Sequence, residues 1–579
     1  MENQKQRAER LIGSFLLCIL SVLLIRHCRL SFCQTDESFY LALAHRLWSG
    51  DRMILDEWNA AQVYSPILLP FYALYRLIIP DGTGVYLYAR ILYVLFATAV
   101  SVLFYQKSRT SNSSSMLSWT AAAMLLLYSR ANICGPSYYN LSLQFAATSA
   151  LLLWKSGNNY HVAENIFAGV FLTLTVICNP YFSFFVLSIL GYMGINPKTR
   201  RRFWGIAAGA ALAALVYFLY LLRSGNPLTL LKSHPPFAYI PFSFGGVLFN
   251  LNKIWIRYLR YASRYVFPLT MIGVLITIWD WKKKKQAGSL PRFLYYFLCL
   301  LFVGFTASKS KISICFVITV PFAILVFPEV IRAFLFRSND FAVIVYVFGV
   351  ALAIAFFFAS NTGLDAMTTG FCLSSAGGLL LLADEPGKEK DTSAKNNIRI
   401  LYKGVCVSLC LLLISVFSVH RFLGIYRDAP VSQLIQRIEK GPAAGLYTTK
   451  SHAEEYNAII DEITKIHEKY PTAGVLFSKS LPWAYLVSDW KCAVFTVWMS
   501  PLSDLRLEQY YQTHQEPDIV FVLDERVASF ETIPFSNLRG VQQYNQNEFE
   551  GPFYDHMIET YEIIENNDYC TVYMKRPGI

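Results

Sequence analysis

Two adjacent carboxylates, Asp36 and Glu37, stand in the stretch SFCQTDESFY, directly after the first long apolar segment of the chain. A chain that leaves a membrane would meet water at this point. A carboxylate placed there can act as a general base, taking a proton from an acceptor while a substrate's lipid tail stays in the bilayer. The local alternative is helix capping, in which Asp36 accepts backbone N–H groups and Glu37 favours the positive end of the helix dipole. The two roles are compatible, because a capped helix end holds a carboxylate rigidly.

The residues after the acids predict an amphipathic helix that lies in the membrane interface. Apolar side chains recur there at helical spacing: Phe39, Tyr40, Leu43, Ala44, Leu47 and Trp48. A second apolar stretch follows within residues 50–80 and is also expected to lie along the membrane. The whole segment 33–83 is then an outer loop of roughly 50 residues, and loops of that length tend to be functional.

The composition requires a non-aqueous solvent for much of the chain. Of 579 residues, 54% are hydrophobic and only 16% are charged, with a mean hydropathy of +0.37. Apolar segments long enough to cross a bilayer, about 20 residues each, recur along the sequence. They predict an α-helical polytopic membrane protein with about thirteen transmembrane helices. The predicted spans lie near 11–32, 84–105, 116–130, 138–154, 163–179, 181–195, 204–222, 265–281, 293–308, 312–331, 341–360, 367–384 and 400–420.

The charge distribution predicts the orientation of these spans. Residues 420–579 hold 22 acidic and 14 basic side chains, whereas the remainder holds 17 acidic and 37 basic ones. Basic residues concentrated in loops between apolar segments indicate the cytoplasmic side, not a nucleic-acid surface. The N-terminus is therefore expected in the cytoplasm, with the first span a retained anchor in the plasma (inner) membrane. The same alternation places residues 223–264 and 420–579 outside the cytoplasm.

The last part of the chain differs in kind. A helix-like stretch, HAEEYNAIIDEITKIHEKY, precedes three strand-like runs, which predicts a small soluble α/β domain. We therefore divide the chain into a transmembrane domain, 1–420, and an extracytoplasmic α/β domain, 421–579. Cys492 and Cys570 of that domain either pair or stay free. The sequence shows no Cys/His metal spacing, P-loop or dinucleotide fingerprint, so no cofactor is expected, although a divalent metal stays open.

The stretch DESFYLALAHRLWSGD resembles the first-loop signature of the GT-C glycosyltransferases. It is most similar to the family-39 branch, bacterial type, which includes protein O-mannosyltransferases and aminoarabinose transferases acting on lipid A. In that branch Asp-Glu-x-x-Tyr precedes a helix and then Gly-Asp. The matching positions here are Asp36, Glu37, Tyr40, Gly50 and Asp51. The order of many spans, a long acidic first outer loop and a soluble C-terminal domain is similar as well.

The resemblance implies a GT-C-like fold and a membrane glycosyltransferase of the cell envelope. The donor would be a sugar on a polyprenyl phosphate in the bilayer, and the acceptor would be a glycolipid, glycan or protein on the outer side. Asp36 would act as base or orient the acceptor, supported by Glu37 and Tyr40, and the acceptor would attack the anomeric carbon with inversion. The leaving lipid phosphate needs positive charge nearby.

The source of that positive charge is where this chain departs from the family. A Lys-Pro element late in the first loop is missing, because Ser65 precedes Pro66. A lysine before a late span is present in ASKSKISICF, as Lys309 or Lys311. Arg90 and Arg257 are further candidates, although Arg257 lies in a Tyr/Arg-rich stretch that equally fits an interfacial belt of snorkelling side chains.

His234, in KSHPPFAY, could assist an acceptor, but a lone loop histidine is as well explained as a surface residue. Two other functions stay open. A transporter or flippase for lipid-linked sugars would place ionisable residues mid-span along a pathway. A non-catalytic polytopic protein would bind a partner through its C-terminal domain and would leave Asp36 replaceable.

Overall fold

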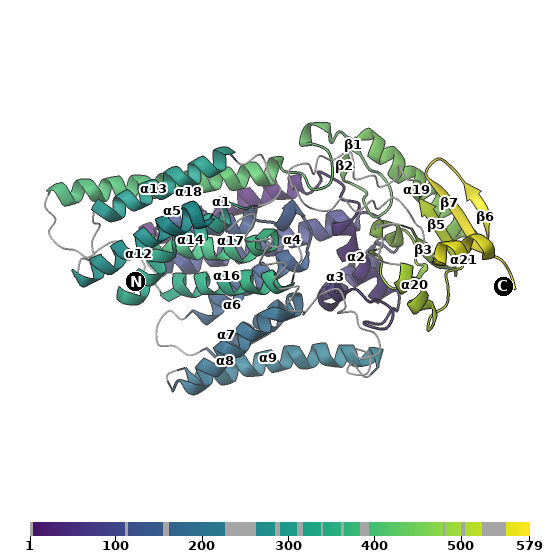
Figure 1. Ribbon diagram of the computed structural model, residues 1–579, viewed down its shortest axis with the longest axis horizontal. Coiled ribbons are helices and arrows are strands. Elements are labelled where there is room, and N and C mark those ends of the chain that lie inside the picture. The colour runs from purple at the N-terminus through teal and green to yellow at the C-terminus, as the bar shows by residue number, and fades with distance from the viewer. Residues whose placement is uncertain are drawn as a thin grey trace.

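A computed structural model places the long apolar helices at one end of an elongated molecule and the strands, with shorter helices beside them, at the other (Figure 1). The N-terminus lies among the helices and the C-terminus beyond the strands. The structure describes residues 4–110, 114–154, 161–197, 199–225, 262–283, 290–309, 316–336, 340–359, 364–382, 393–478, 481–498, 504–523 and 552–578.

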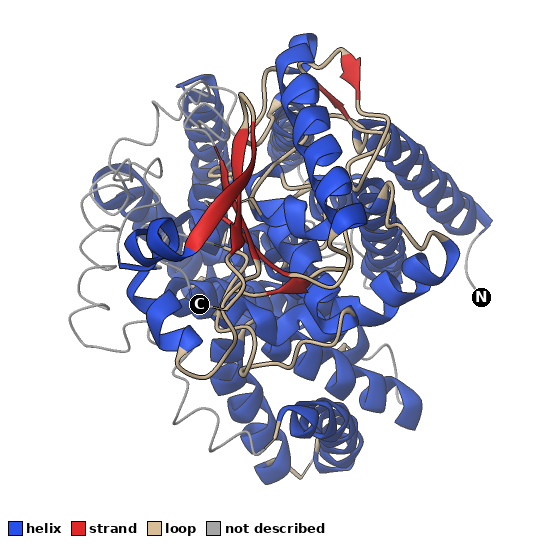
Figure 2. Ribbon diagram, turned by 90° about the vertical axis from the view of Figure 1, so that its right-hand side faces the viewer, coloured by secondary structure: helices blue, strands red, loops and turns tan. Residues whose placement is uncertain are grey.

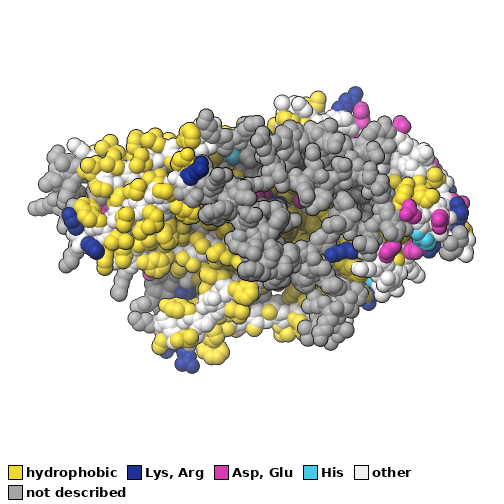
Figure 3. Space-filling model, in the orientation of Figure 1, with side chains coloured by type: hydrophobic (Ala, Val, Ile, Leu, Met, Phe, Trp, Pro, Cys, Tyr) yellow, Lys and Arg dark blue, Asp and Glu magenta, His cyan; other side chains and the backbone are white. Residues whose placement is uncertain are grey.

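Helices form where the sequence has long apolar runs, which confirms a multi-pass membrane protein. Within the described residues, seven segments are long and apolar enough to cross a bilayer. They belong to α1 (Gln4–His27), α4 (Val85–Thr110), α9 (Arg200–Leu221), α13 (Leu290–Lys309), the pair α14 (Thr319–Leu325) and α15 (Phe327–Phe336), α16 (Asp340–Ala359) and α18 (Ser393–Leu423). Figure 3 shows the hydrophobic surface that this end of the molecule presents.

The remaining predicted spans are also helical but shorter, at 13 to 18 residues. At 1.5 Å per residue they reach about 20–27 Å, less than a hydrocarbon core of about 30 Å. The thirteen predicted spans therefore all overlap helical segments, seven of which are long and apolar enough to cross a bilayer. The shorter helices are α5 (Ser115–Leu127), α6 (Tyr138–Leu153), α7 (Val162–Cys178), α8 (Ser183–Ile195), α12 (Phe267–Lys282) and α17 (Leu364–Leu381).

Helices α7 and α9 approach so closely that only glycine fits between their backbones. A Cβ on Gly169 would lie 2.0 Å from the carbonyl oxygen of Ile206, and one on Gly209 would lie 1.9 Å from that of Ile166. Gly209 ends the small-residue stretch GIAAG of α9. That stretch is therefore a helix-packing face, as such patterns commonly are.

The long first outer loop folds into α2 (Asp36–Trp48) and α3 (Ser65–Ile78). The prediction that the first of these helices lies in the membrane interface is wrong, because residues 37–46 are all buried within the protein. The physical reason is that both halves of the molecule enclose α2. Phe39 packs edge-on against Trp498 of the C-terminal part, with ring centroids 5.3 Å apart, and Tyr40 packs against Tyr138 of α6 at 5.7 Å.

Helix α3 keeps an apolar outer face. Four of its side chains are 46–72% exposed: Phe71, Leu74, Leu77 and Ile78. The opposite face is buried and includes Tyr72 and Arg76. A helix with this division suits a position along a membrane surface, as expected from the sequence.

The C-terminal part is built on a five-stranded mixed sheet (Figure 2). The strand order is β4-β3-β5-β7-β6, in which β3 runs parallel to β4 and β5 while β7 runs antiparallel to β5 and β6. Helix α19 (Lys450–Lys469) begins after the capping residue Thr449. Cys492 and Cys570 are both free. The strands are β3 (Gly474–Phe477), β4 (Lys491–Cys492), β5 (Ile519–Leu523), β6 (Tyr561–Asn566) and β7 (Cys570–Lys575), with α20 (Asp504–Tyr511) and α21 (Pro552–Thr560) beside them.

A smaller hairpin joins the membrane helices to this domain. It consists of β1 (Gln436–Arg437) and β2 (Tyr447–Thr448). The backbone N–H of Tyr447 donates to the carbonyl of Arg29, at 2.7 Å, and its carbonyl accepts from the N–H of Ser31, at 2.9 Å. Trp58 of the first outer loop donates its backbone N–H to Phe495 at 2.7 Å. The first outer loop and the C-terminal domain therefore form one continuous structure around α2.

Candidate active site

Asp36 is the first residue of α2, and its carboxylate is held by side chains of the segment that follows the last membrane helix. The hydroxyl of Tyr426 donates to Oδ2 of Asp36 at 2.5 Å, and Nη1 of Arg427 lies 2.8 Å from the same oxygen. Among the described residues, every recorded hydrogen bond to this carboxylate goes to Oδ2. Its side chain is 17% exposed. One carboxylate oxygen is thus fixed, while Oδ1 is left for another group.

The structure does not use Asp36 as the predicted helix cap. Thr35 occupies the N-cap position, and no side-chain capping bond is present there. The carboxylate of Asp36 instead accepts from side chains about 390 residues away in sequence. The capping interpretation of Asp36 is therefore wrong in this structure.

Arg427 lies in the linker between α18 and β1, where its backbone φ is +51°. This left-handed conformation is uncommon for a residue with a side chain. Its Nη1 also donates to Oγ1 of Thr35 at 2.5 Å. Burial raises the pKa of Tyr426 well above its ordinary value, so its hydroxyl stays protonated and can donate to Asp36.

The next linker residue, Asp428, is buried and holds the linker to the C-terminal domain. Its carboxylate accepts from the backbone N–H of Phe32 at 2.7 Å, from Oγ1 of Thr448 at 2.9 Å, and from the backbone N–H of Ala429 at 2.8 Å. Nδ1 of His452 in α19 lies 3.1 Å from Oδ1 of the same carboxylate. The hydrogen bond that His452 donates to Asp428 raises the pKa of His452, which favours the charged imidazolium.

Glu37, the second acid of the pair, points in a different direction from Asp36. Its two oxygens accept from Nε and Nη2 of Arg90 in α4, at 2.6 and 2.5 Å. The other N–H groups of Arg90 donate to the carbonyls of Cys28, Leu30 and Ser31. A guanidinium has five N–H donors, and these contacts engage all of them. Arg90 therefore fixes the turn before α2, and no donor is left for a substrate phosphate.

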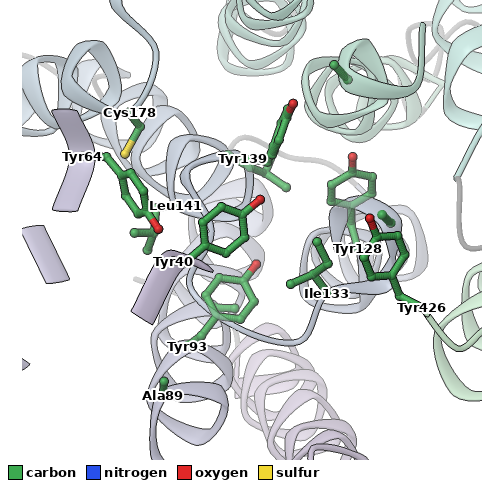
Figure 4. Packing of buried hydrophobic residues seen from close by; sticks show 14 of the residues in the cluster. Tyr40, Tyr64, Ala89, Tyr93, Tyr128, Ile133, Tyr139, Leu141, Cys178 and Tyr426 are labelled. Carbon is green, nitrogen blue, oxygen red and sulfur yellow. The ribbon is translucent and has the colours of Figure 1, made fainter. Parts of the chain in front are cut away.

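Tyr40 lies one turn along α2 from Asp36, within a group of buried tyrosines (Figure 4). Its ring packs edge-on against those of Tyr64 and Tyr138, with centroids 5.9 and 5.7 Å apart. Burial raises the pKa of Tyr40 well above its ordinary value. The phenol is consequently neutral, and it lies one helical turn from the acid.

A cation that sequence reasoning missed, Arg130, lies in the turn between α5 and α6. Its guanidinium carbon is 4.4 Å from the ring centroid of Tyr139, and Nη2 lies 3.1 Å from the carboxylate of Asp365. Tyr139 belongs to the group of buried tyrosines that includes Tyr40 and Tyr426 (Figure 4). The sequence places Arg130 at the end of the predicted span 116–130, and only the folded arrangement brings it to the site.

The turn that carries Arg130 is bonded to the end of the last membrane helix. Asn132, with φ of +58°, donates from Nδ2 to the carbonyls of His420 and Arg421 at 3.1 Å each, and to that of Gly424. Arg421 in turn donates from Nη1 to Oδ1 of Asn132 at 2.7 Å. These hydrogen bonds join the turn that carries Arg130 to the end of α18, next to the linker that contacts Asp36.

At the other end of α2, Arg46 organises the chain that follows. It is fully buried and pairs with Asp51 at 2.5 Å and with Glu57 at 2.8 Å. It also donates to the backbone carbonyl of Asp56 at 2.6 Å. Asp51, the aspartate of the Gly-Asp element noted in the sequence, therefore has a contact within the fold and fixes the exit of α2.

The structure leaves several predicted site residues untested. His234, Arg257 and Lys311 lie outside the described residues, and Lys309 is the last residue of α13, where only the backbone is described. The predicted phosphate contacts of these residues therefore stay predictions. Within the described ranges, no group of three or more His, Cys, Asp or Glu side chains could hold a metal ion.

Comparisons with known proteins give a likeness to solved structures but none to a known sequence family. No family model matches the chain, and no curated protein matches it. Among solved structures, the chain is similar to an oligosaccharyltransferase from Archaeoglobus fulgidus, crystallised with zinc and sulfate. The identity is 11% and the TM-score 0.47, over 89% of this chain and 68% of that chain. A likeness of this degree says nothing about individual residues.

Proposed function

We propose that this protein is a membrane glycosyltransferase that moves a sugar from a polyprenyl-phosphate-linked donor to an acceptor on the outer side of the membrane. The observation that carries the proposal is the Asp36 carboxylate, held through Oδ2 by Tyr426 and Arg427 at the junction of the two halves. When one carboxylate oxygen is held by the protein, the other oxygen is available to accept a proton from the acceptor. This arrangement suits a positioned general base.

In the proposed reaction, an acceptor hydroxyl attacks the anomeric carbon while Oδ1 of Asp36 takes its proton. The new glycosidic bond forms as the bond between the anomeric carbon and the phosphate oxygen breaks, with inversion. The electron pair of that bond leaves on the lipid phosphate, so cationic groups near the phosphate stabilise the transition state. Lys309, Lys311 and Arg257 stay candidates, and Arg130 joins them.

The surroundings of Asp36 support a lipid-linked substrate. On the outer face of α3, four apolar side chains are 46–72% exposed: Phe71, Leu74, Leu77 and Ile78. Tyr217 of the span α9 donates to the carbonyl of Val63, just before α3, at 2.8 Å. The membrane-facing surface thus continues from a span to the outer loop that carries the acid, where a polyprenyl chain could lie beside it.

The transporter alternative gains no support from the buried charges of the described spans. Arg292 and Glu329 form a buried pair at 2.7 Å, and Tyr296 donates to Glu329 at 2.8 Å. Arg292 is the third residue of α13, next to a helix end and not mid-span. A compact pair of this kind, with its hydrogen bonds made internally, is a packing feature and not a pathway.

The deciding experiment compares the parent with Asp36→Asn in nanodiscs. The probes are radiolabelled mannose-, glucose- and aminoarabinose-linked polyprenyl phosphates, and release of polyprenyl phosphate is measured. Asn keeps an acceptor oxygen for Tyr426, so the fold should persist, while transfer should fall by about 10²–10⁴-fold. Asp461→Asn, at an exposed position of α19, serves as the matched control. Turnover of Asp36→Asn at the parent rate would remove Asp36 as the base.

A further inference from the structure

Three consecutive residues of the linker after α18 connect the carboxylate of Asp36 to the C-terminal domain. Tyr426 and Arg427 both contact Oδ2 of Asp36. Asp428, the next residue, is held by a backbone N–H of the first outer loop and by side chains of β2 and α19. Neighbouring residues of one short segment therefore contact the acid on one side and the domain on the other.

We infer that Tyr426 and Arg427 are positioning residues that orient Asp36, and that Asp428 sets their place by anchoring the linker to the C-terminal domain. The inference rests on the proposed function, because it assigns a role to groups that act through Asp36. It extends that function, because the C-terminal domain then takes part in orienting the Asp36 carboxylate.

The contact geometry explains how the orientation is achieved. A carboxylate at the first position of a helix can rotate about its side-chain torsions, and rotation would exchange or displace its two oxygens. A phenol donor at 2.5 Å and a guanidinium at 2.8 Å on the same oxygen oppose that rotation. Bonds to charged groups are roughly twice as strong as neutral ones. The second contact of Arg427, to Thr35 before α2, fixes the guanidinium relative to the helix start.

The backbone of Arg427 supports the same conclusion. Its φ of +51° is an uncommon conformation for a residue with a side chain, of the kind that persists only where surrounding contacts impose it. Those contacts are present on the adjacent residue, since the Asp428 carboxylate accepts from Phe32, Thr448 and Ala429 and pairs with His452. The anchored Asp428 thus holds Arg427 in the conformation that reaches Asp36.

The test measures donor turnover for Tyr426→Phe, Arg427→Gln and Asp428→Asn, each in the parent and in the Asp36→Asn background. In the parent, Arg427→Gln should lower kcat by about 10–100-fold, since a misplacement of about 1 Å can cost 10²-fold. Tyr426→Phe should lower kcat by about 10-fold, and KM for the donor should change less than about threefold in both. Arg427→Lys should lower kcat less than Arg427→Gln does, because lysine keeps the positive charge but lacks the planar set of N–H donors of arginine.

The Asp36→Asn background separates positioning from other roles. Residues that act only through the carboxylate cause no further loss once it is gone, so each second substitution should change residual turnover by less than about twofold. Arg437→Gln and Tyr470→Phe are matched controls in the same domain, and both should turn over at the parent rate. Gel filtration and melting temperature report folding, and Tyr426→Phe, which removes a single hydroxyl, remains informative if a charge change unfolds the protein.

Each contrary result has a distinct meaning. Parent-like turnover of Tyr426→Phe and Arg427→Gln beside an impaired Asp36→Asn would overturn the inference and leave the base in place. Losses that multiply in the Asp36→Asn background would also overturn it, by showing that the linker residues contact substrate. Parent-like turnover of Asp36→Asn itself would overturn both the proposed function and the inference.

Discussion

The guanidinium of Arg90 binds both carboxylate oxygens of Glu37, at 2.6 and 2.5 Å, and both side chains are almost fully buried. Arg90 comes from a membrane helix, and Glu37 is the second residue of the helix that carries Asp36. The adjacent acids thus have separate roles in the structure: Asp36 is held at the junction by the linker residues Tyr426 and Arg427, and Glu37 attaches its helix to the membrane domain.

Glu37→Gln should therefore destabilise the protein. The substitution leaves a buried guanidinium without its counter-charge, which costs on the order of 3 kcal/mol. The measurement is the free energy of unfolding in detergent, by denaturant titration. A matched control is available on the same helix, because Arg109 of α4 pairs with Glu9, whose side chain is 35% exposed. Glu9→Gln should change stability by less than about 1 kcal/mol. An equal loss of stability in both variants would contradict the stabilising role of the pair between Glu37 and Arg90.

The lysines before the late span should serve the lipid phosphate. Replacing Lys309 and Lys311 together by Met should lower donor turnover, with each removed contact worth on the order of 2–4 kcal/mol of transition-state stabilisation. The assay is release of polyprenyl phosphate in nanodiscs, with melting temperature measured in parallel. Unchanged turnover would move the phosphate site toward Arg130, whose guanidinium lies over Tyr139. In that case Arg130→Gln should lower donor turnover.

The pair between His452 and Asp428 should make stability depend on pH. The pKa of His452 is raised by its hydrogen bond to Asp428. A raised pKa in the folded state contributes stability that is fully present below about pH 6.5, the unfolded value, and that is lost as pH rises through the folded value. The effect should stay below about 1 kcal/mol, because the imidazole is 25% exposed. Melting temperatures measured from pH 5.5 to 8.5 should fall toward the alkaline end, and His452→Gln should reduce this fall. If the melting temperature of His452→Gln falls as steeply as that of the parent, another group causes the pH dependence.

The orientation of the chain predicts which positions react with a membrane-impermeant thiol reagent. A cysteine at Glu454, which is exposed on α19, should react from outside the cell. One at Lys283, which is exposed at the end of α12, should react only after the membrane is permeabilised. The unsubstituted protein gives the background of its native cysteines, of which Cys18 is exposed. Labelling of the Lys283 position in intact cells would reverse the orientation and move the acid pair to the cytoplasmic side.

The helices were predictable from the sequence, because apolar length and composition are local properties. A helix after Asp36 was predictable for the same reason, from the spacing of Tyr40, Leu43 and Leu47. Its environment was not, since apolar residues on a helix pack equally well against lipid or protein. Two strands of the C-terminal domain, β3 and β5, lie in strand-like runs of the sequence, whereas the run 492–498 is a strand only at Cys492 and the strands β6 and β7 were not predicted.

The partners of the acid pair could not be predicted. Tyr426 and Arg427 lie about 390 residues from Asp36 in sequence, and no local pattern reports such a contact. Arg130 reaches the site only because its turn is bonded to the end of α18. A signal was present in the polar Tyr-Arg-Asp triplet placed directly after the last apolar run, where a linker would tolerate many other residues.

The backbone pairing of Tyr447 with Arg29 and Ser31, and of Trp58 with Phe495, has a consequence for engineered hybrids. The exchangeable unit is not the stretch after the last membrane helix, because that stretch also pairs with the residues after α1 and with the first outer loop. A hybrid that takes only its C-terminal domain from another protein would have to recreate those pairings with foreign side chains around α2. Grafting the first outer loop and the C-terminal domain together keeps these pairings, and the new membrane domain then has to supply the partners of α2, such as Arg90 of α4 and Tyr138 of α6.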